Sequence, residues 1–409
     1  MRLKKIYYFI FLLEVFICKS QIKYFNFSII DGSQMITMRQ SNQLVQEGNR
    51  LLANFVIKEK KSEKYFNLGS LLISSIILQP ITHEEGHRSV LTELKIGAIS
   101  QPIFDKNMVA KVTGVTDATL KNLRDNNLPY YIRLHTSGLE SDFTYLNSLN
   151  SKLSFEEEEY KKVKGDVIAR NIGVSFYYLS SFISRKFSLD EFKSPELERD
   201  IVGHDIWGMI RHINRPDMEF HRYTTWDELT SKEKKMANRI ALFSLVNFLN
   251  PNLVGIRNYT LKNGNKFGFN IGYSLAPFGE YFQQNIYYYV PTKNIKINPY
   301  LMQYFNNEKV FLAGGIKLVN YEIHPKILLN SSLDVWSQPE NLSYTSSKGK
   351  LGAGVQINGA YKILDINEEK SKSIFVNLGF SAKTKGFIPE APSLKEDFRI
   401  NMGLIYVIQ

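Results

Sequence analysis

The chain has 409 residues, a hydrophobic fraction of 44% and a formal charge of +11 at pH 7. This composition excludes a disordered tail protein and allows a chain of this length to form two domains with buried cores. The positive charge is spread along the chain and does not form a basic stripe with interleaved aromatic residues, so we expect no nucleic-acid partner.

The first 20 residues have the pattern of a secretory signal peptide. A basic start, an apolar stretch over residues 6–17 and small residues at the end predict cleavage after Ser20. A lipoprotein signal at Cys18 is the less favoured alternative, because Ile17 stands where such a signal has a small side chain. Cys18 is the only cysteine, so the mature chain must build any metal site from His, Asp or Glu.

Helical spacing of apolar residues predicts an amphipathic helix over residues 42–60, with its apolar stripe packed in the core. The stripe consists of Leu44, Leu51, Leu52, Phe55 and Val56. The apolar segment from Leu71 to Leu78 then leads into Pro80, which suits the start or a kink of a helix. Neither this segment nor the longer one after Val167 reaches eighteen apolar residues, so we expect no membrane-spanning helix in the mature chain.

The sequence His83-Glu84-Glu85-Gly86-His87 follows directly. Residues four apart share one face of a helix, so His83 and His87 can bind one metal ion together. Glu84 would lie beside that ion, where it could act on a bound water molecule. The alternative is an exposed amphipathic helix with histidines on its polar side, so a third ligand is needed to establish a site.

The best candidate for that ligand lies between His135 and Asp142, where Glu140 and Asp142 follow Gly138 at the expected start of a second helix. Here the chain resembles the gluzincin-type metallopeptidases, in which the His-Glu-x-x-His helix is followed by a helix that carries a glutamate ligand. The residues around Glu140 depart from the thermolysin-like pattern, and the interval after the motif is longer. Asp142 therefore stays an alternative, as a ligand or as a partner that orients a histidine.

The resemblance implies a role for each matching residue. His83 and His87 would bind Zn²⁺, with Glu140 as the third ligand. Glu84 would polarise the water molecule and shuttle its proton. For Glu140, the simpler interpretation is a helix N-terminal carboxylate stabilised by the helix dipole.

Three capping signals predict further helices. Thr116 caps a short helix over residues 117–126. A capping box at residues 154–157 is expected to open a long helix that reaches about Lys186, with its four glutamates forming a solvated first turn. A second capping box, at residues 230–233, opens a helix that ends at Asn250-Pro251.

A second polar cluster lies between Arg199 and His212. Asp200, His204, Gly208 and Arg211 fall close to one helical face. His204 is our candidate to stabilise the negative charge that develops on a carbonyl oxygen during hydrolysis. A buried His-Asp-Arg network that joins helices is an equally weighted alternative.

After Asn250-Pro251 the pattern changes to about nine strand-like runs in which large apolar residues alternate with small or polar ones. Runs of this length with aromatic residues near their ends favour an antiparallel β-barrel of eight to ten strands in an outer membrane. A soluble β-sandwich is the alternative. The expected fold is thus α+β, with a signal peptide (1–20), a helical zincin-like domain (21–250) and a barrel (251–409).

The function that these patterns predict is an exported zinc metallopeptidase anchored in the outer membrane, with its helical domain in the periplasm or at the surface. Its partners would be a peptide or protein substrate and membrane lipid around the barrel. The alternative is a non-enzymatic barrel protein, such as an assembly or complex subunit, whose metal site is structural or vestigial.

Overall fold

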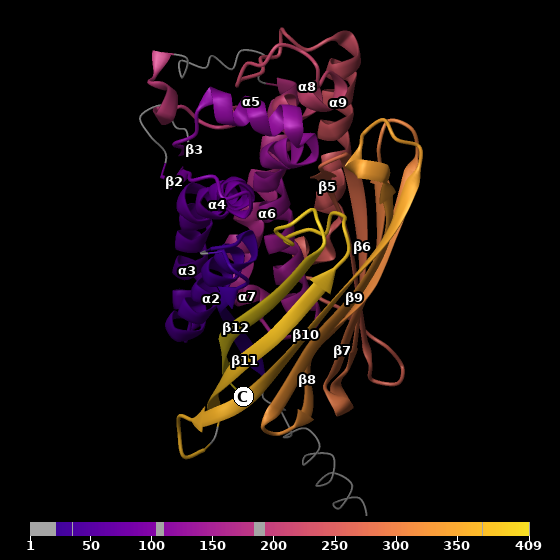
Figure 1. Ribbon diagram of the computed structural model, residues 1–409. Coiled ribbons are helices and arrows are strands. Elements are labelled where there is room, and N and C mark those ends of the chain that lie inside the picture. The colour runs from indigo at the N-terminus through magenta and orange to yellow at the C-terminus, as the bar shows by residue number, and fades with distance from the viewer. Residues whose placement is uncertain (1–21, 35, 104–109, 184–192, 370, 409) are drawn as a thin grey trace, which may run out of the picture.

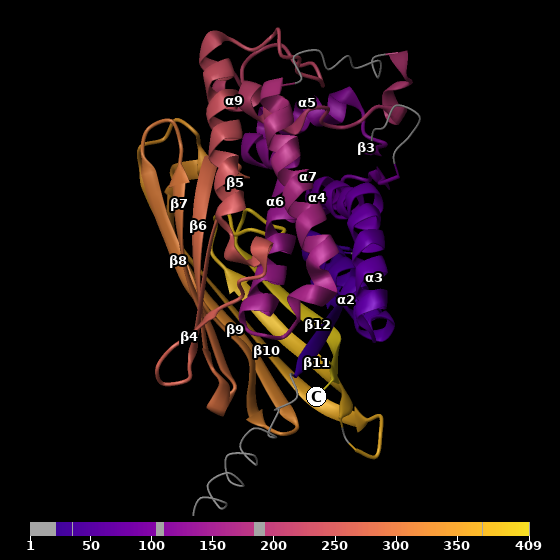
Figure 2. The same cartoon turned by 180° about the vertical axis from the view of Figure 1, so that it is seen from behind.

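The computed structural model describes residues 22–34, 36–103, 110–183, 193–369 and 371–408, and the predicted signal peptide lies outside these residues. The fold is α+β: a group of helices lies against one side of a ten-stranded antiparallel sheet (Figures 1 and 2). The main helices are α2 (Met38–Val56), α3 (Lys60–Ile73), α4 (Gln79–Glu93), α5 (Asp117–Asn126), α6 (Leu128–Ser154), α7 (Tyr160–Ile183), α8 (Asp205–Asn214) and α9 (Ser231–Ser244).

The sheet has the strand order β1-β12-β11-β10-β9-β8-β7-β6-β5-β4. Its strands are β1 (Lys23–Asp31), β4 (Tyr259–Thr260), β5 (Lys266–Ala276), β6 (Gly279–Val290), β7 (Ile295–Phe305), β8 (Val310–His324), β9 (Ile327–Pro339), β10 (Gly349–Asp365), β11 (Lys372–Lys383) and β12 (Asp397–Ile408). Nine of them follow the helices, as expected, whereas β1 precedes the helices and pairs with β12. No pairing joins β1 to β4 within the described residues, so the predicted closure into a barrel is not shown. A separate hairpin is formed by β2 (Ile99–Gln101) and β3 (Lys111–Thr113).

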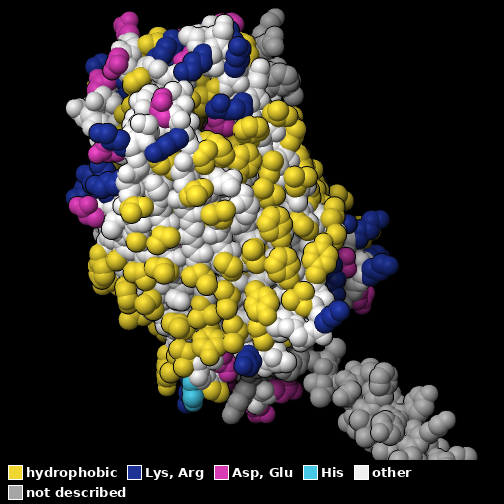
Figure 3. Space-filling model, turned by 90° about the vertical axis from the view of Figure 1, so that its right-hand side faces the viewer, with side chains coloured by type: hydrophobic (Ala, Val, Ile, Leu, Met, Phe, Trp, Pro, Cys, Tyr) yellow, Lys and Arg dark blue, Asp and Glu magenta, His cyan; other side chains and the backbone are white. Residues whose placement is uncertain are grey.

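The two faces of the large sheet differ in polarity. The face that points away from the helices is covered by exposed apolar side chains (Figure 3). They include Phe269, Leu301, Leu312, Ile316, Leu333, Val335, Ile357, Leu378, Phe380, Phe398 and Ile400. The face toward the helices buries polar side chains, among them Asn270, Asn285, Lys296, Asn298, Asn320 and Asn401, beside an apolar cluster around Trp336. The alternation expected from the sequence is confirmed, and its apolar side points outward over much of the sheet.

Helix α2 has the same inverted polarity. It overlaps the expected helix over residues 42–60 but begins and ends four residues earlier. Its N-cap is Thr37, whose side chain accepts a hydrogen bond from the Gln40 amide in a capping box. The prediction that its apolar stripe packs in the core is wrong: Leu44 is 64% exposed and Phe55 54% exposed. The side of α2 that faces inward is polar, with Asn42, Gln46, Glu47 and Arg50 all buried.

The segment Lys60–Glu93 is one continuous helix, in which the π-helical segment η1 (Ser74–Leu78) joins α3 to α4. Within the described residues it is the one helix whose length and composition would allow it to cross a membrane, and 22% of its apolar window is buried. Small and polar residues such as Ser70 and Ser74 interrupt the apolar run. Length and composition alone do not test the prediction that no helix of the mature chain spans a membrane.

The predicted helix from residue 154 to about Lys186 is also wrong at its start, and its expected end lies outside the described residues. Helix α6 ends at Ser154, and α7 begins only at Tyr160. Two of the four glutamates are not solvated: Glu157 is buried against Lys296, at 2.8 Å, and Glu158 against Lys23, at 3.2 Å. The helices capped by Thr116 and Thr230 are confirmed.

Candidate metal centre

The candidate site forms where α4, α6 and α8 cross. Close approach of α4 to α6 depends on Gly86, because a Cβ atom there would lie 2.4 Å from the carbonyl oxygen of Ser137. Close approach of α8 to α6 depends in the same way on Gly208, where a Cβ atom would meet the ring of His135 at 2.3 Å. The glycines bring side chains from three separate parts of the sequence into one buried volume.

His83, His87 and Asp205 form a group that could hold a metal ion. His83 and His87 lie one turn apart on α4, as the sequence predicts, and Asp205 is the first residue of α8. The Oδ2 atom of Asp205 lies 3.2 Å from His83 Nε2 and 3.4 Å from His87 Nε2. All three ligand atoms lie within 4.8 Å of one another.

These separations fit a four-coordinate metal ion. Zinc bonds to nitrogen and oxygen are about 2.0–2.1 Å long, so two ligand atoms of a tetrahedral site are about 3.3–3.4 Å apart. The two measured His–Asp separations, 3.2 and 3.4 Å, match this spacing. Three protein ligands leave the fourth position open.

Close approach of α6 to the two histidines depends on Gly138. Gly138 faces the two histidines, and a Cβ atom there would lie 2.4 Å from His83 Nε2 and 2.5 Å from His87 Nε2. Asp205 Oδ2 is buried at the same place and, in the described part of the chain, accepts no well-aligned hydrogen bond. A buried carboxylate oxygen without such a partner is costly unless a cation or a donor satisfies it.

The other ring nitrogens of both histidines are engaged. His83 Nδ1 lies 2.8 Å from Asp142 Oδ2, and His87 Nδ1 lies 2.6 Å from the carbonyl oxygen of Leu134. When Nδ1 donates its hydrogen to an acceptor of this kind, Nε2 is left with the lone pair that a metal requires. The predicted alternative role of Asp142, orienting a histidine, agrees with this contact.

The loop before α8 places Asp205. Gly203 has a φ of +68°, a conformation that favours glycine, and its amide donates to the carboxylate of Asp200 at 2.7 Å. This turn positions Asp205 at the start of α8. Burial alone would raise the pKa of Asp205, but the adjacent His87 and His83 hold it well below its usual range.

Glu84 lies between the two histidines in sequence and is 7% exposed. No hydrogen bond from the described residues reaches its carboxylate, unlike that of Glu85, which pairs with the half-buried Arg88. Burial raises the pKa of Glu84 to about 7, with nearby Asp200 and Asp205 adding to the rise and the two histidines opposing it. A carboxyl group with this pKa can accept or donate a proton near neutral pH.

The structure places Glu140 away from this group. Its carboxylate forms a bidentate ion pair with Arg133, at 2.7 and 3.1 Å, and accepts the amide hydrogen of Glu390 at 2.8 Å. The carboxylate that joins the two histidines is Asp205, which sequence reasoning did not select as a ligand. The available signal was that Asp205 directly follows His204 and Gly203, inside the polar cluster that was already singled out.

His204 caps the start of α8 beside Asp205 and is buried. Its ring stacks on Trp207 with centroids 4.0 Å apart, and it lies 5.7 Å from the ring of Tyr177. Burial lowers the pKa of His204 to about 4, so its imidazole is neutral at pH 7. A neutral imidazole can still donate one N–H, which keeps the predicted role of His204 open.

A second buried group lies next to the site. Tyr131, His135 and His212 are fully buried, with ring centroids 4.9–5.6 Å apart. Within the described residues, the hydroxyl of Tyr131 and both ring nitrogens of each histidine have no hydrogen-bond partner. Burial lowers the pKa of His135 to about 3 and that of His212 well below its usual value, so both are neutral at pH 7.

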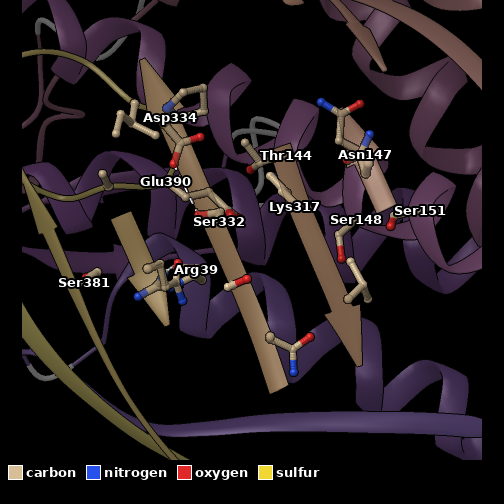
Figure 4. Close-up of a pocket in the computed structure, with 18 of the residues that line it drawn as sticks. Arg39, Thr144, Asn147, Ser148, Ser151, Lys317, Ser332, Asp334, Ser381 and Glu390 are labelled. Carbon is tan, nitrogen blue, oxygen red and sulfur yellow. Dashed lines mark hydrogen bonds between the residues drawn. The ribbon is translucent and has the colours of Figure 1, made fainter. Parts of the chain in front are cut away.

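A cavity of about 360 Å³ lies between α2, α6 and the inward face of the sheet (Figure 4). Its walls are mostly polar or charged, with Arg39, Lys317, Asp334 and Glu390 pointing into it. The cavity shows that the space between helices and sheet is polar at this level, which is the reverse of an ordinary protein interior.

Comparison with known proteins adds no family assignment. No protein-family model matches the chain, and no curated protein is significantly similar to it.

Proposed function

We propose that the chain is an exported, membrane-embedded zinc hydrolase that cleaves peptide bonds. The observation that carries this proposal is the convergence of His83, His87 and Asp205, whose ligand atoms lie within 4.8 Å of one another beside Gly138. Imidazole and carboxylate donors suit Zn²⁺, and an open fourth position is characteristic of catalytic rather than structural zinc sites.

A bound zinc ion would supply Lewis-acid activation of a water molecule and of a substrate carbonyl. Glu84 is placed beside the ligands to accept a proton from that water, and its raised pKa suits a base that works near neutral pH. Asp142 and the Leu134 carbonyl fix the orientation of the two ligand imidazoles. His204 remains the candidate donor for the charge that develops on the carbonyl oxygen.

The membrane part of the proposal is supported by the inverted polarity of the sheet. A sheet in water exposes its polar face and buries its apolar face, whereas this sheet does the opposite over much of its area (Figure 3). An apolar surface of this extent marks an interaction with another apolar phase. Together with the predicted signal peptide, this polarity supports an outer-membrane location.

Burial of the site favours one second candidate, a non-enzymatic membrane protein or complex subunit with a structural metal ion. The His83 side chain is 12% exposed, and the side chains of His87 and Asp205 are each 2% exposed. A structural ion needs no access for a substrate, so such burial would suit it. The two candidates differ in what they require of Glu84.

Metal analysis and hydrolysis of fluorogenic peptides by the purified mature protein test the proposal. Wild type should bind close to one zinc ion per chain, and Asp205→Ala should lose it. Glu84→Gln should keep the metal and lose hydrolysis, while the neighbouring control Glu85→Gln should keep both. A wild-type protein that binds no zinc would refute the metal site, and unchanged hydrolysis in Glu84→Gln would remove Glu84 from the mechanism.

A further inference from the structure

The open sheet leaves two edges, at β1 and β4, and helices connect them. Helix α2 packs on β1, α3 packs on α2 and α7, and α7 packs on α9. The 3₁₀ segment η4 (Leu245–Leu249), which continues α9, packs on β5 beside the short strand β4. Viewed from behind, these helices fill the side of the molecule that the sheet leaves open (Figure 2).

Side chains from these helices hydrogen-bond to the backbone at the sheet edges. At β1, Arg50 donates to the carbonyl oxygen of Tyr24 at 3.1 Å, and Gln40 donates to that of Ile29 at 3.0 Å. At the other edge, the two-residue strand β4 pairs only with Lys266 and Phe267 of β5. Further along β5, the side chain of Asn247 accepts from the Tyr273 amide at 2.7 Å and donates to its carbonyl oxygen at 3.2 Å. Inside a membrane, edge groups without partners are costly, so these bonds satisfy a requirement that water would otherwise meet.

The outward side of the helices is apolar. On α3 and η1 the exposed residues include Tyr65, Leu68, Leu72, Ile73, Ile76 and Ile77. On α2 they are Leu44, Leu52, Phe55 and Val56, on α7 Ile172 and Phe176, and on η4 Phe248 and Leu249. The apolar surface of the sheet thus continues on the helical side of the molecule.

The length of the uncharged section fits a bilayer. Charged residues are frequent up to Lys64, and none occurs in the eighteen residues from Tyr65 to Thr82. At 1.5 Å per residue this helical section is about 27 Å long, close to the hydrocarbon thickness of about 30 Å. Ion pairing resumes at the far end, where Glu85 pairs with Arg88.

We infer that α2, α3 with η1, α7 and η4 form a helical wall that faces lipid and closes the gap in the sheet. The occupant of this surface is the acyl-chain region of a bilayer. A second copy of the chain could cover one side only, whereas exposed apolar residues lie on both the sheet and the helices. Because His83 follows Thr82 directly, the inference places the metal centre at the boundary between lipid and water.

The inference rests on the proposed membrane location, so the test must separate the two. The mature chain has no cysteine, because Cys18 lies in the predicted signal peptide, and single-cysteine variants are therefore straightforward to label. A bimane label at Leu72→Cys reports on the helical wall, and one at Leu333→Cys reports on the sheet. Lys61→Cys, in the charged start of α3, is the matched control outside the bilayer.

Each labelled variant is reconstituted into phosphatidylcholine vesicles with and without bromine on the acyl chains. Comparable quenching at Leu72→Cys and Leu333→Cys, with little at Lys61→Cys, would support the helical wall. Quenching at Leu333→Cys alone would overturn the helical wall and leave the membrane location intact. Absence of quenching at both positions would overturn the membrane location itself.

Discussion

Replacing Gly138 with alanine should weaken metal binding strongly without removing a ligand. The added Cβ atom would lie 2.4 and 2.5 Å from the two Nε2 atoms, and a zinc ion needs to lie about 2.0–2.1 Å from the same atoms. The methyl group would overlap both imidazole rings. The rings must therefore turn away from it, and their two Nε2 atoms lose the arrangement that a bound ion requires.

The size of the effect follows from this overlap. Changing a partner that only orients a ligand typically lowers metal affinity by about 10–100-fold. Displacing both ligand imidazoles should cost more, so we expect a loss of at least about 100-fold. Alanine also has a higher helix propensity than glycine by roughly 0.5–1 kcal/mol, which opposes any loss of stability of the metal-free protein.

Competition with a fluorescent zinc chelator measures the affinity, and thermal unfolding in EDTA measures the stability of the metal-free form. Gly69→Ala is the matched control, because Gly69 is also helical and a Cβ atom there meets nothing within 4 Å. Gly69→Ala should bind zinc as wild type does. Wild-type affinity in a folded Gly138→Ala protein would refute the location of the metal between the two histidines.

Two further predictions concern groups beside the site. Glu140→Gln should keep the zinc, since Glu140 pairs with Arg133. The same change should lower the free energy of unfolding by about 3–5 kcal/mol, because Arg133 becomes an unpaired buried charge. Zinc loss with unchanged stability would instead identify Glu140 as a ligand. Burial lowers the pKa of His212. Below about pH 6.5 the unfolded, metal-free protein in EDTA therefore binds a proton at His212 that the folded protein does not bind. The free energy of unfolding should then fall as the pH drops, by up to about 1.4 kcal/mol per pH unit. His212→Gln should reduce that slope between pH 6.5 and 5, and parallel curves for the two proteins would contradict it.

The local part of the site could be read from the sequence, and the distant part could not. His83 and His87 are neighbours because they are four residues apart on one helix, which spacing alone determines. Asp205 joins them only because α6 passes between α4 and α8 with glycines at both crossings. No local pattern of residues encodes that crossing. Glu140 matched the gluzincin-like pattern of a glutamate on the following helix, but its carboxylate pairs with Arg133, two turns earlier on α6.

The fold shows a similar division. Periodicity predicted about nine strand-like runs after Pro251 and a helix over residues 42–60, which overlaps α2, because alternation and helical spacing depend on sequence neighbours. The same periodicity does not tell which side of an element meets solvent. The stripe of Leu44 and Phe55 would pack inward in a protein surrounded by water, and it points outward here. Strand β1 was missed because its pairing partner, β12, lies at the other end of the chain.

Buried ion pairs on the inward side of the helices orient the ligand His83. Arg170 is fully buried, donates to the Thr82 hydroxyl at 2.6 Å and lies 3.8 Å from Asp142. Asp142 in turn orients His83. Burying such ions typically costs several kcal/mol each unless they are paired inside the protein, so a chain with an apolar exterior must pair its inward charges with one another. These buried ion pairs supply the charged scaffold that orients the His83 imidazole, and the candidate metal centre should lose its geometry when Arg170 or Asp142 loses its charge.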